Sequence, residues 1–307
     1  MKHAIVVENL VKHYGNVVAV DGISFEVPRT SIYGFVGPNG AGKTTTIKML
    51  CCLLKPTSGK AWINGISIEE ELKIKEIIGY LPENLQLYKF FTVEEHIRFI
   101  GKLYKIEENE LKQKIRELLE IVNMHGFRKR KCGKLSKGQQ RRVGIAISLI
   151  NDPEILILDE PTSGLDPLGR KDILNLLLKL RSAGKTIFLS SHILPEISQI
   201  CTHIGVINCG KLLFSRSIDN LKQQFMSLKM EVKVEKDPSK FIGDLETKDW
   251  VKSVKVENNR IVVEVLDMNV AKVELIKVLA KHSLPVVSLR ILEPNLEDLF
   301  IKMLGGK

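Results

Sequence analysis

The chain has 307 residues, of which 44% are hydrophobic and 27% are charged. At roughly 150 residues per domain, this length predicts about two domains. The apolar fraction is enough for buried cores and excludes a largely disordered chain. The formal net charge of +10 is compatible with nucleic acid, an anionic membrane surface or a phosphorylated ligand as partner.

Most of this charge comes from one segment. Residues 126–142 contain no acidic side chain and the following basic ones: Arg128, Lys129, Arg130, Lys131, Lys134, Lys137, Arg141 and Arg142. Without these eight, 38 of the 46 basic residues remain against 36 acidic ones, a net charge of +2. The role of this segment therefore decides what the charge means.

Neither a membrane span nor a disulfide framework is evident. No apolar run approaches the ~20 residues that cross a bilayer, and the N-terminal ten residues lack a signal-peptide pattern. The five cysteines are odd in number and irregularly spaced, which is typical of a reducing compartment. Cys201, His203 and Cys209 lack the close pairing of most zinc sites, which favours small core residues there. We expect a cytosolic protein whose membrane part, if any, belongs to another chain.

The first two thirds of the chain alternate strand-like and helix-like segments. Strands are predicted at 5–7, 17–20, 23–27, 32–36, 155–158, 186–189 and 204–207. Helices are predicted at 44–54, within 92–123 and at 174–180. The continuous apolar strands are typical of a parallel sheet that is covered on both faces. This order predicts an α/β fold.

After about residue 221 the pattern changes. Alternating strands are predicted at 229–234, 251–256, 261–266 and 286–292, with helices at 270–281 and 295–304 and a turn at Asn258 and Asn259. This order suggests a small α+β domain of ferredoxin-like type. We therefore expect one domain at 1–220 and an accessory domain at 221–307.

A phosphate-binding loop is predicted between the strand at 32–36 and the next helix. Gly37-Pro38-Asn39-Gly40-Ala41-Gly42-Lys43-Thr44 matches G-x-x-x-x-G-K-[ST]. Its glycines let backbone N–H groups curl around a polyphosphate. Lys43 is expected to neutralise the β- and γ-phosphates and Thr44 to bind Mg²⁺, with Thr45 beside them at the helix N-terminus. A Gly-rich turn without a ligand is the alternative.

Two carboxylates follow the apolar strand at 155–158. Asp159 is expected to hold Mg²⁺ through water, as the acid at the end of such a strand does in P-loop NTPases. Glu160 is the candidate to polarise the attacking water, which requires an unprotonated carboxylate. An ordinary solvated acidic turn before Pro161 is the alternative.

Other elements stand around these motifs in a fixed order: Tyr14, Leu135-Ser136-Lys137-Gly138-Gln139, Ser163-Gly164-Leu165-Asp166 and His192. With them, residues 1 to about 215 resemble the nucleotide-binding cassette of ATP-binding cassette (ABC) transporters, with its signature sequence, D-loop and switch histidine. The resemblance implies a P-loop NTPase fold. It has a mixed, mainly parallel sheet, an N-terminal antiparallel β subdomain and a helical subdomain at about 84–150.

The resemblance also implies how the cassette works. Two cassettes pair head to tail with each ATP between them, so Ser136 and the Gly138 backbone contact the γ-phosphate bound to the opposite copy. Asp166 acts across the same interface. Tyr14 stacks on adenine, and His192 bonds the γ-phosphate.

Two residues depart from the family's pattern. Lys137 stands where the signature most often has glycine, so its side chain must point away or add a phosphate contact. Glu83 stands where the family has a glutamine, and a carboxylate there can still bind Mg²⁺ or a water. Membrane-subunit contacts are expected around 85–91, where Tyr88, Phe90 and Phe91 suit a partner helix; core packing is the alternative.

The function implied is that of an ATPase subunit that binds ATP and Mg²⁺ at the cytoplasmic face of the cell membrane. Its expected partners are integral membrane permease subunits and a second ATP-binding subunit, identical or homologous. The tail after about Leu221, which ends with residues Glu293 to Phe300, resembles the extension of exporter-type cassettes for drugs, ions or lipids and suggests efflux.

Two other functions stay open. One is a soluble ABC-type ATPase acting on ribosomes or DNA, although such relatives carry two cassettes or a long coiled coil. The other is a clamp in which hydrolysis is unimportant. Because the basic segment includes the signature, we interpret it as a surface that attracts the triphosphate, and we expect no nucleic-acid partner.

Overall fold

The computed structural model describes residues 3–193, 198–224, 228–235, 239–257 and 259–292. The chain divides into two compact units, one ending at Asp219 and the other beginning at Asn220. Each unit has a hydrophobic core of its own. Within the described ranges, no helix combines the length and the apolar composition that crossing a bilayer requires.

The main sheet of the first unit has six strands in the order β10-β9-β3-β8-β7-β6. All neighbours are parallel except β9 and β10. Strands β3, β7 and β8 are buried along their whole length, as expected for a parallel sheet covered on both faces. The bounds are β3 (Ile32–Val36), β6 (Ile78–Leu81), β7 (Ile155–Leu158), β8 (Thr186–Ser191), β9 (His203–Asn208) and β10 (Lys211–Ser217).

An antiparallel sheet in the order β2-β1-β4-β5 packs against the main sheet. Its strands are β1 (His3–Tyr14), β2 (Val17–Pro28), β4 (Ser58–Ile63) and β5 (Ile66–Ser67). The two strands predicted at 17–20 and 23–27 are one strand, β2. Gly22 adopts φ 63° at a shift in the β1–β2 register, so the turn-like residues there form a bulge and do not end the strand.

Four aromatic rings join the two sheets. The Phe188 ring lies 5.8 Å from that of Phe25, 5.5 Å from that of Tyr33 and 5.5 Å from that of Phe35, measured between centroids. Such pairs stabilise a core by about 0.5–1.5 kcal/mol each beyond the area they bury. The contact holds strands β2, β3 and β8 in a fixed relation beside the phosphate loop.

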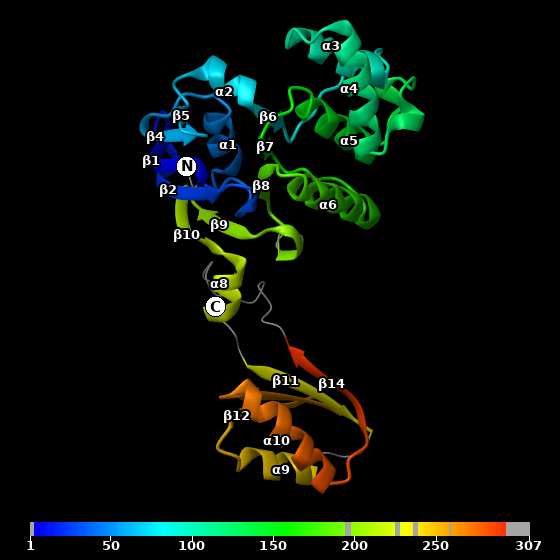
Figure 1. Cartoon of the computed structure of the whole chain (residues 1–307). Coiled ribbons are helices and arrows are strands. Elements are labelled where there is room, and N and C mark those ends of the chain that lie inside the picture. Colours follow the sequence, from blue (N-terminus) through cyan, green and yellow to red (C-terminus); the bar gives the residue numbers. More distant parts are fainter. Residues whose placement is uncertain (1–2, 194–197, 225–227, 236–238, 258, 293–307) are drawn as a thin grey trace. The chain divides into compact units, whose positions relative to one another are not determined.

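The helices cover the main sheet, with α1 on one side and α5 and α6 on the other (Figure 1). Outside the helical lobe, the first unit contains α1 (Lys43–Leu50), α2 (Glu71–Ile77) and α6 (Pro167–Ser182), and α8 (Ile218–Gln224) spans the boundary between the two units. Helix α1 is shorter than the predicted 44–54, because Cys52 adopts φ 54° and the chain leaves the helix there. Helix α6 is longer than predicted, because Asp166 caps it and Pro167 fits its first turn.

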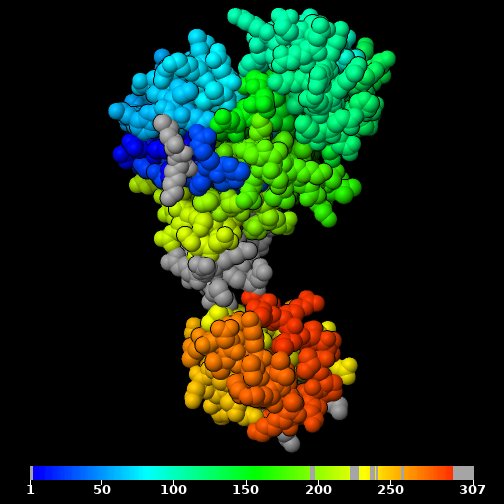
Figure 2. Space-filling model, viewed as in Figure 1, coloured from blue at the N-terminus to red at the C-terminus, as the bar shows by residue number. Residues whose placement is uncertain are grey.

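A helical lobe projects from the first unit (Figure 2). It consists of α3 (Val93–Leu103), α4 (Glu108–Ile121), two short 3₁₀ turns (His125–Phe127 and Cys132–Lys134) and α5 (Lys137–Ser148). Reciprocal capping boxes begin α3 at Thr92 and α5 at Ser136. Each box satisfies two backbone donors of the first turn, which fixes where α5 starts.

The second unit is a four-stranded antiparallel sheet in the order β12-β13-β11-β14 with helices α9 and α10. Its elements are β11 (Lys229–Val234), α9 (Ser239–Glu246), β12 (Val251–Glu257), β13 (Arg260–Val265), α10 (Met268–Lys281) and β14 (Val286–Leu292). This βαββαβ order is the ferredoxin-like topology. Helix α9 was not predicted. The helix predicted at 295–304 and Asn258 lie outside the described residues.

The second unit's core can be tested by itself. Phe241 is 1% exposed in this core, so Phe241→Ala should lower the free energy of unfolding of this unit by about 3–5 kcal/mol. The chain's only two tryptophans are Trp62 and Trp250, and Trp250 packs against this core. Trp250 fluorescence in a Trp62→Phe background therefore follows the unit's denaturation.

Val273→Ala is the matched control, because Val273 is exposed on α10 and such changes usually cost less than about 0.5 kcal/mol. Equal losses in the two variants would contradict the assignment of this core.

Candidate nucleotide site

The phosphate loop connects β3 to α1 and curls around the amine of Lys43. This side chain is buried and donates to the carbonyl oxygens of Gly37 and Pro38 at 2.7 and 3.2 Å. The backbone N–H of Ala41 donates to the Pro38 carbonyl at 3.2 Å. The loop therefore already has a closed shape, with Lys43 at its centre.

Glycine is required in this loop for close backbone approach. Gly42 adopts φ 108°, and a Cβ on it would stand 2.5 Å from the backbone oxygen of Ala19. A Cβ on Gly37 would overlap the backbone oxygen of Ile207. Side chains at either position would push the loop away from β2 or β9.

Asp159 follows β7 and is 1% exposed. Its Oδ1 accepts hydrogen bonds from the hydroxyls of Ser190, at 2.7 Å, and Thr44, at 3.3 Å. Its Oδ2 is buried and has no hydrogen-bond partner among the described residues. A buried polar atom without a partner is costly, so this oxygen is an obvious candidate to face a ligand.

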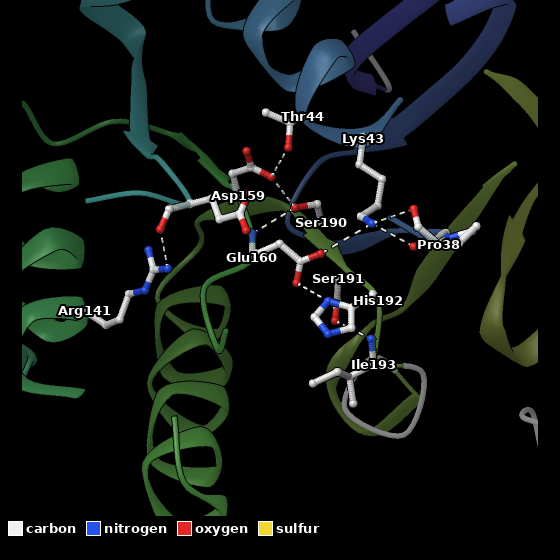
Figure 3. Close-up of polar contacts among 12 residues, drawn as sticks. Pro38, Lys43, Thr44, Arg141, Asp159, Glu160, Ser190, Ser191, His192 and Ile193 are labelled. Atoms are coloured by element: carbon white, nitrogen blue, oxygen red, sulfur yellow. Dashed lines mark hydrogen bonds and ion pairs between the residues drawn. The ribbon is translucent and has the colours of Figure 1, made fainter. Parts of the chain in front are cut away.

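Glu160 lies between Lys43 and His192 (Figure 3). Its Oε1 is 3.5 Å from the Lys43 amine and its Oε2 is 2.9 Å from Nδ1 of His192. The Glu160 backbone N–H donates to the Ser190 hydroxyl at 2.9 Å. Glu160 has φ 48°, a left-handed conformation that costs a non-glycine residue roughly 1–2 kcal/mol. The surroundings thus hold this carboxylate in a strained but fixed position.

One cavity of about 380 Å³ brings many of the predicted residues together. It is lined by Ala19, Asn39, Gly40, Gly42, Lys43, Thr44, Thr45, Glu83, Glu160, Ser163 and His192. It lies at the carboxyl ends of β3 and β7, where α/β sheets bind ligands. The cavity combines a cationic loop with carboxylates, as phosphoryl transfer requires.

The oxygen donors here fit a magnesium ion. Mg²⁺ is usually held through one or two carboxylates together with substrate phosphates; here Asp159 and Glu83 supply carboxylate oxygens and Thr44 a hydroxyl oxygen. The unpartnered Oδ2 of Asp159 supports this fit. The described residues contain no group of three or more His, Cys, Asp or Glu side chains arranged for a metal, so Cys201, His203 and Cys209 do not form one.

Other predicted residues lie outside this cavity. Ser136 caps α5 and accepts from the backbone N–H of Gln139 at 3.3 Å, and Gly138 follows in the first turn. Asp166 caps α6. Tyr14 is half exposed, with the Lys12 amine 5.5 Å from its ring centroid. These residues are not part of one chain's own phosphate pocket.

Two arginines of the basic segment 126–142 make hydrogen bonds inside the chain. The interpretation of this segment as a surface that attracts a triphosphate did not predict these bonds. Arg141 is buried and donates to the carbonyls of Pro82 and Glu83. Arg142 donates to the Val122 carbonyl and to Asp172, both at 3.0 Å or less. The structure therefore corrects that interpretation for Arg141 and Arg142.

The signature lysine lies near the D-loop of its own chain. A Cβ built on Gly164 would stand 3.7 Å from the Lys137 amine, and both residues line a second cavity of about 230 Å³. The Lys137 side chain is thus directed toward Gly164 of the same chain, and a phosphate contact of Lys137 stays a prediction.

The aromatic residues before α3 form a partly exposed cluster. The Tyr88 ring contacts those of Phe91 and Phe99 at centroid distances of 5.3 and 5.7 Å, whereas Phe90 is 86% exposed. The rings of Tyr88 and Phe91 therefore pack against each other at the surface, and the alternative of burial in the core is not met.

Sequence reasoning missed three residues of the site. Ser190 bonds both Asp159 and Glu160, and its position at the end of a strand beside β7 was the available signal. Ser163 lines the cavity but was noted only as part of the D-loop. Ala19 carries no signal, because its contribution is a backbone oxygen and a small side chain.

The parallel sheet, the phosphate loop and the strand-end acids define a P-loop nucleotide-hydrolysing protein. Family models agree: residues 20–163 match the ABC transporter model, and residues 217–304 match the C-terminal domain of ATP-binding protein DrrA1-3-like.

Known relatives extend over nearly the whole chain. It is 38% identical to the bacitracin transport ATP-binding protein BcrA of Bacillus licheniformis over 97% of this chain and 96% of that protein. It is 33% identical to the linearmycin resistance ATP-binding protein LnrL of Bacillus subtilis strain 168 over 97% of each chain. Among solved structures, a dimeric post-hydrolysis state of the ATP-binding cassette MJ0796 bound to ADP and Pi has a TM-score of 0.63 and 26% identity, covering 70% of this chain and 98% of that one.

The chain belongs to the ATP-binding proteins of ABC transporters. It is an ATPase with a DrrA-like C-terminal domain, and its fold is the P-loop α/β fold expected from the sequence.

Gly42 provides a test of the loop geometry. Gly42→Ala should lower the affinity for ATP by at least about tenfold, a loss of 1.4 kcal/mol, because the new Cβ collides with the Ala19 oxygen. Binding of a fluorescent ATP analogue measures this.

Gly15→Ala is the matched control. Gly15 also has positive φ, at 57°, but a Cβ there meets nothing within 4 Å. This variant should lose about 1–2 kcal/mol of stability and keep its affinity for ATP. Unchanged affinity in Gly42→Ala would refute the proposed role of the close approach.

Proposed function

We propose that this chain is the ATP-hydrolysing subunit of an exporter that removes an antimicrobial compound from the cell. The supporting observation is the similarity to bacitracin transport and linearmycin resistance proteins over 97% of the chain, which includes the second unit. The subunit lies at the cytoplasmic face of the membrane, bound to integral membrane permease subunits. Residues 1–220 form the ATP-binding domain and 221–307 an accessory domain.

The phosphate loop binds the triphosphate. Backbone N–H groups of Asn39, Gly40 and Gly42, together with the N-terminus of α1, bind the phosphates, and Lys43 contacts the β- and γ-phosphates. Lys43 thereby exchanges part of its contact with Glu160 for a phosphate. Tyr14 stacks on adenine and Thr45 adds a contact at the start of α1.

Magnesium is held by Thr44, by Asp159 and, through the loop after β6, by Glu83. When bound, Mg²⁺ neutralises charge that develops on the β- and γ-phosphates. The buried Oδ2 of Asp159 supports this assignment, since a bound ion or its water gives that atom the partner it lacks.

Glu160 orients the attacking water and accepts its proton. Its two oxygens together offer about four lone-pair positions, so contacts with Lys43 and His192 leave room for a water. His192 bonds Glu160 at 2.9 Å and lines the same cavity, which lets it reach the γ-phosphate as well. Loss of the γ-phosphate therefore changes the contacts of His192, the residue that follows β8.

ATP binding closes a dimer with a second ATP-binding subunit, identical or homologous. Ser136 and the Gly138 backbone contact the γ-phosphate held by the other copy, at the N-terminus of α5. Asp166 acts across the same interface. Their place outside the chain's own cavity supports this arrangement, as does the dimeric state of the similar cassette MJ0796. Exposed Phe90 is available to a permease helix.

A role on ribosomes or DNA is the second candidate, and no structural observation favours it. The basic residues Arg141 and Arg142 are engaged inside the chain, which weakens the nucleic-acid interpretation of the charge. Affinity purification of the tagged chain should recover an integral membrane protein. Recovery of ribosomes or DNA without one would overturn the transporter assignment.

Glu160→Gln tests the catalytic assignment. The amide cannot accept a proton, so ATP hydrolysis should fall by about 10²-fold or more while ATP binding is kept. Both are measured on the same purified protein by phosphate release and by nucleotide binding. Because Lys43 would lose a buried partner, thermal denaturation must confirm that the variant is folded. Turnover near the wild-type rate would exclude this role.

Ser136→Arg tests the shared interface. The long cation should block closure, so ATP-dependent dimers of the Glu160→Gln protein disappear in size-exclusion chromatography. Thr92→Arg is the matched control, since Thr92 caps α3 with the same kind of capping box and should leave dimers intact. Dimers that persist in Ser136→Arg would disprove the cross-dimer model.

A further inference from the structure

Arg141 has no assigned role, yet it is one of the most enclosed charged groups near the site. It lies in the second turn of α5 and is 8% exposed. Its guanidinium donates to the backbone carbonyls of Pro82, at 2.8 Å, and of Glu83. A planar guanidinium can satisfy two acceptors at once, so Arg141 fixes the chain direction where Glu83 leaves β6.

The same guanidinium is close to the acidic residues of the site. Burial lowers its pKa, while the negative charges of Glu83, Asp159 and Glu160 act in the opposite direction. Arginine remains protonated in proteins. Arg141 therefore offsets part of a concentration of negative charge that lies where a triphosphate must bind.

The loop that Arg141 holds is connected to the metal-site strand. The backbone N–H of Asp159 donates to the Leu81 carbonyl at 2.8 Å, one residue before the carbonyls that Arg141 contacts. Displacement of Pro82 and Glu83 would thus be transmitted directly to Asp159.

The helix that carries Arg141 begins at the signature motif. Ser136 caps α5, and Lys137, four residues before Arg141, lies on the same helix face. The cavity of about 230 Å³ is lined by the two basic residues Lys137 and Arg141 and also by Glu83 and Gly164. One helix face therefore touches the loop bearing Glu83 and the loop after Glu160.

Its neighbour Arg142 has similar chemistry with a different target. Arg142 is partly buried and donates to the Val122 carbonyl and to Asp172, which ties α5 to the end of α4 and to α6. Arg142 thus anchors α5 to its neighbouring helices, whereas both hydrogen bonds of Arg141 go to the loop that enters the site.

We propose that Arg141 is a positioning residue for ATP hydrolysis: it fixes the Glu83 loop to the signature helix and so sets the position of Glu83 relative to Asp159 and Glu160. The proposal rests on the function proposed above, because it assumes that these carboxylates act on MgATP. Arg141 itself need not touch the nucleotide.

Arg141→Lys keeps the charge but cannot satisfy both carbonyls in the fork geometry. Its kcat for ATP hydrolysis should fall about tenfold, while KM for ATP changes by less than about threefold, the pattern of an interaction that matters in the transition state. Arg141→Met, which also removes the charge, should lower kcat by about a hundredfold.

Hydrogen exchange without nucleotide gives a readout independent of activity. The amides of residues 83–85 should exchange faster in Arg141→Lys than in the wild type. The matched control Arg142→Lys should leave exchange in 83–85 unchanged and kcat within about twofold, since its contacts lie elsewhere. Equal effects of the two substitutions on exchange and on kcat would mean that Arg141 only anchors α5, and would overturn the proposal.

A double-mutant cycle tests the route through Glu83. If Arg141 acts by placing Glu83, Glu83→Gln combined with Arg141→Met should have about the same kcat as the more impaired single variant. A double variant whose kcat falls by the product of the two single reductions would show that Arg141 does not act through Glu83. Failure of the function itself looks different: Glu160→Gln would then retain wild-type hydrolysis, whereas failure of this proposal alone leaves Glu160→Gln inactive and Arg141→Lys fully active.

Discussion

The first unit is organised around buried charges at the carboxyl ends of β3 and β7. Lys43 and Glu160 are each about 5–6% exposed and 3.5 Å apart, and Asp159 is more deeply buried still. Charges removed from water are costly unless they are paired and hydrogen-bonded. Here the loop carbonyls, the Ser190 hydroxyl and His192 provide the remaining contacts. The site is therefore stable only as an assembly, in which each side chain depends on the others.

This requirement explains features that otherwise look unrelated. Gly42 permits the phosphate loop to approach the backbone of β2, and Glu160 has a strained, positive φ. The aromatic contacts among β2, β3 and β8 keep the strands that supply these residues in register. Helix α5 adds a second layer, because the guanidinium of Arg141 attaches the Glu83 loop to the helix that starts at the signature. The nucleotide pocket and the signature thus share one rigid connection within the chain.

Much of the fold was predictable because its signals are local. The strands at 155–158 and 229–234 were located to the residue, since their apolar patterns have no competing interpretation. Helix α1 ends earlier than predicted, because Cys52 adopts a left-handed conformation. A cysteine at this position gives no sign of that conformation in the sequence. The strand β2 was divided in the prediction at Gly22, since a bulge and a turn have the same sequence signal.

The residues of the site also fall into those that the sequence predicts and those that only the structure reveals. The phosphate loop and the strand-end acids were recognisable from their motifs, whereas Ser190 and Arg141 act through contacts between segments distant in sequence, 31 residues apart for Ser190 and Asp159. Arg141 was misread as part of a charged surface, because a run of basic residues does not reveal which member is turned inward.

The most direct test of this account measures metal binding at Asp159. With a non-hydrolysable ATP analogue bound, Mn²⁺ can replace Mg²⁺ and its affinity can be followed by electron paramagnetic resonance in the wild type and in Asp159→Asn. The asparagine keeps the oxygen that faces Ser190 and Thr44 but removes the charge next to the metal. We expect Asp159→Asn to weaken Mn²⁺ binding by about 10–100-fold in a folded protein. Equal Mn²⁺ affinity in the two proteins would contradict the assignment of these buried charges to a magnesium–nucleotide site.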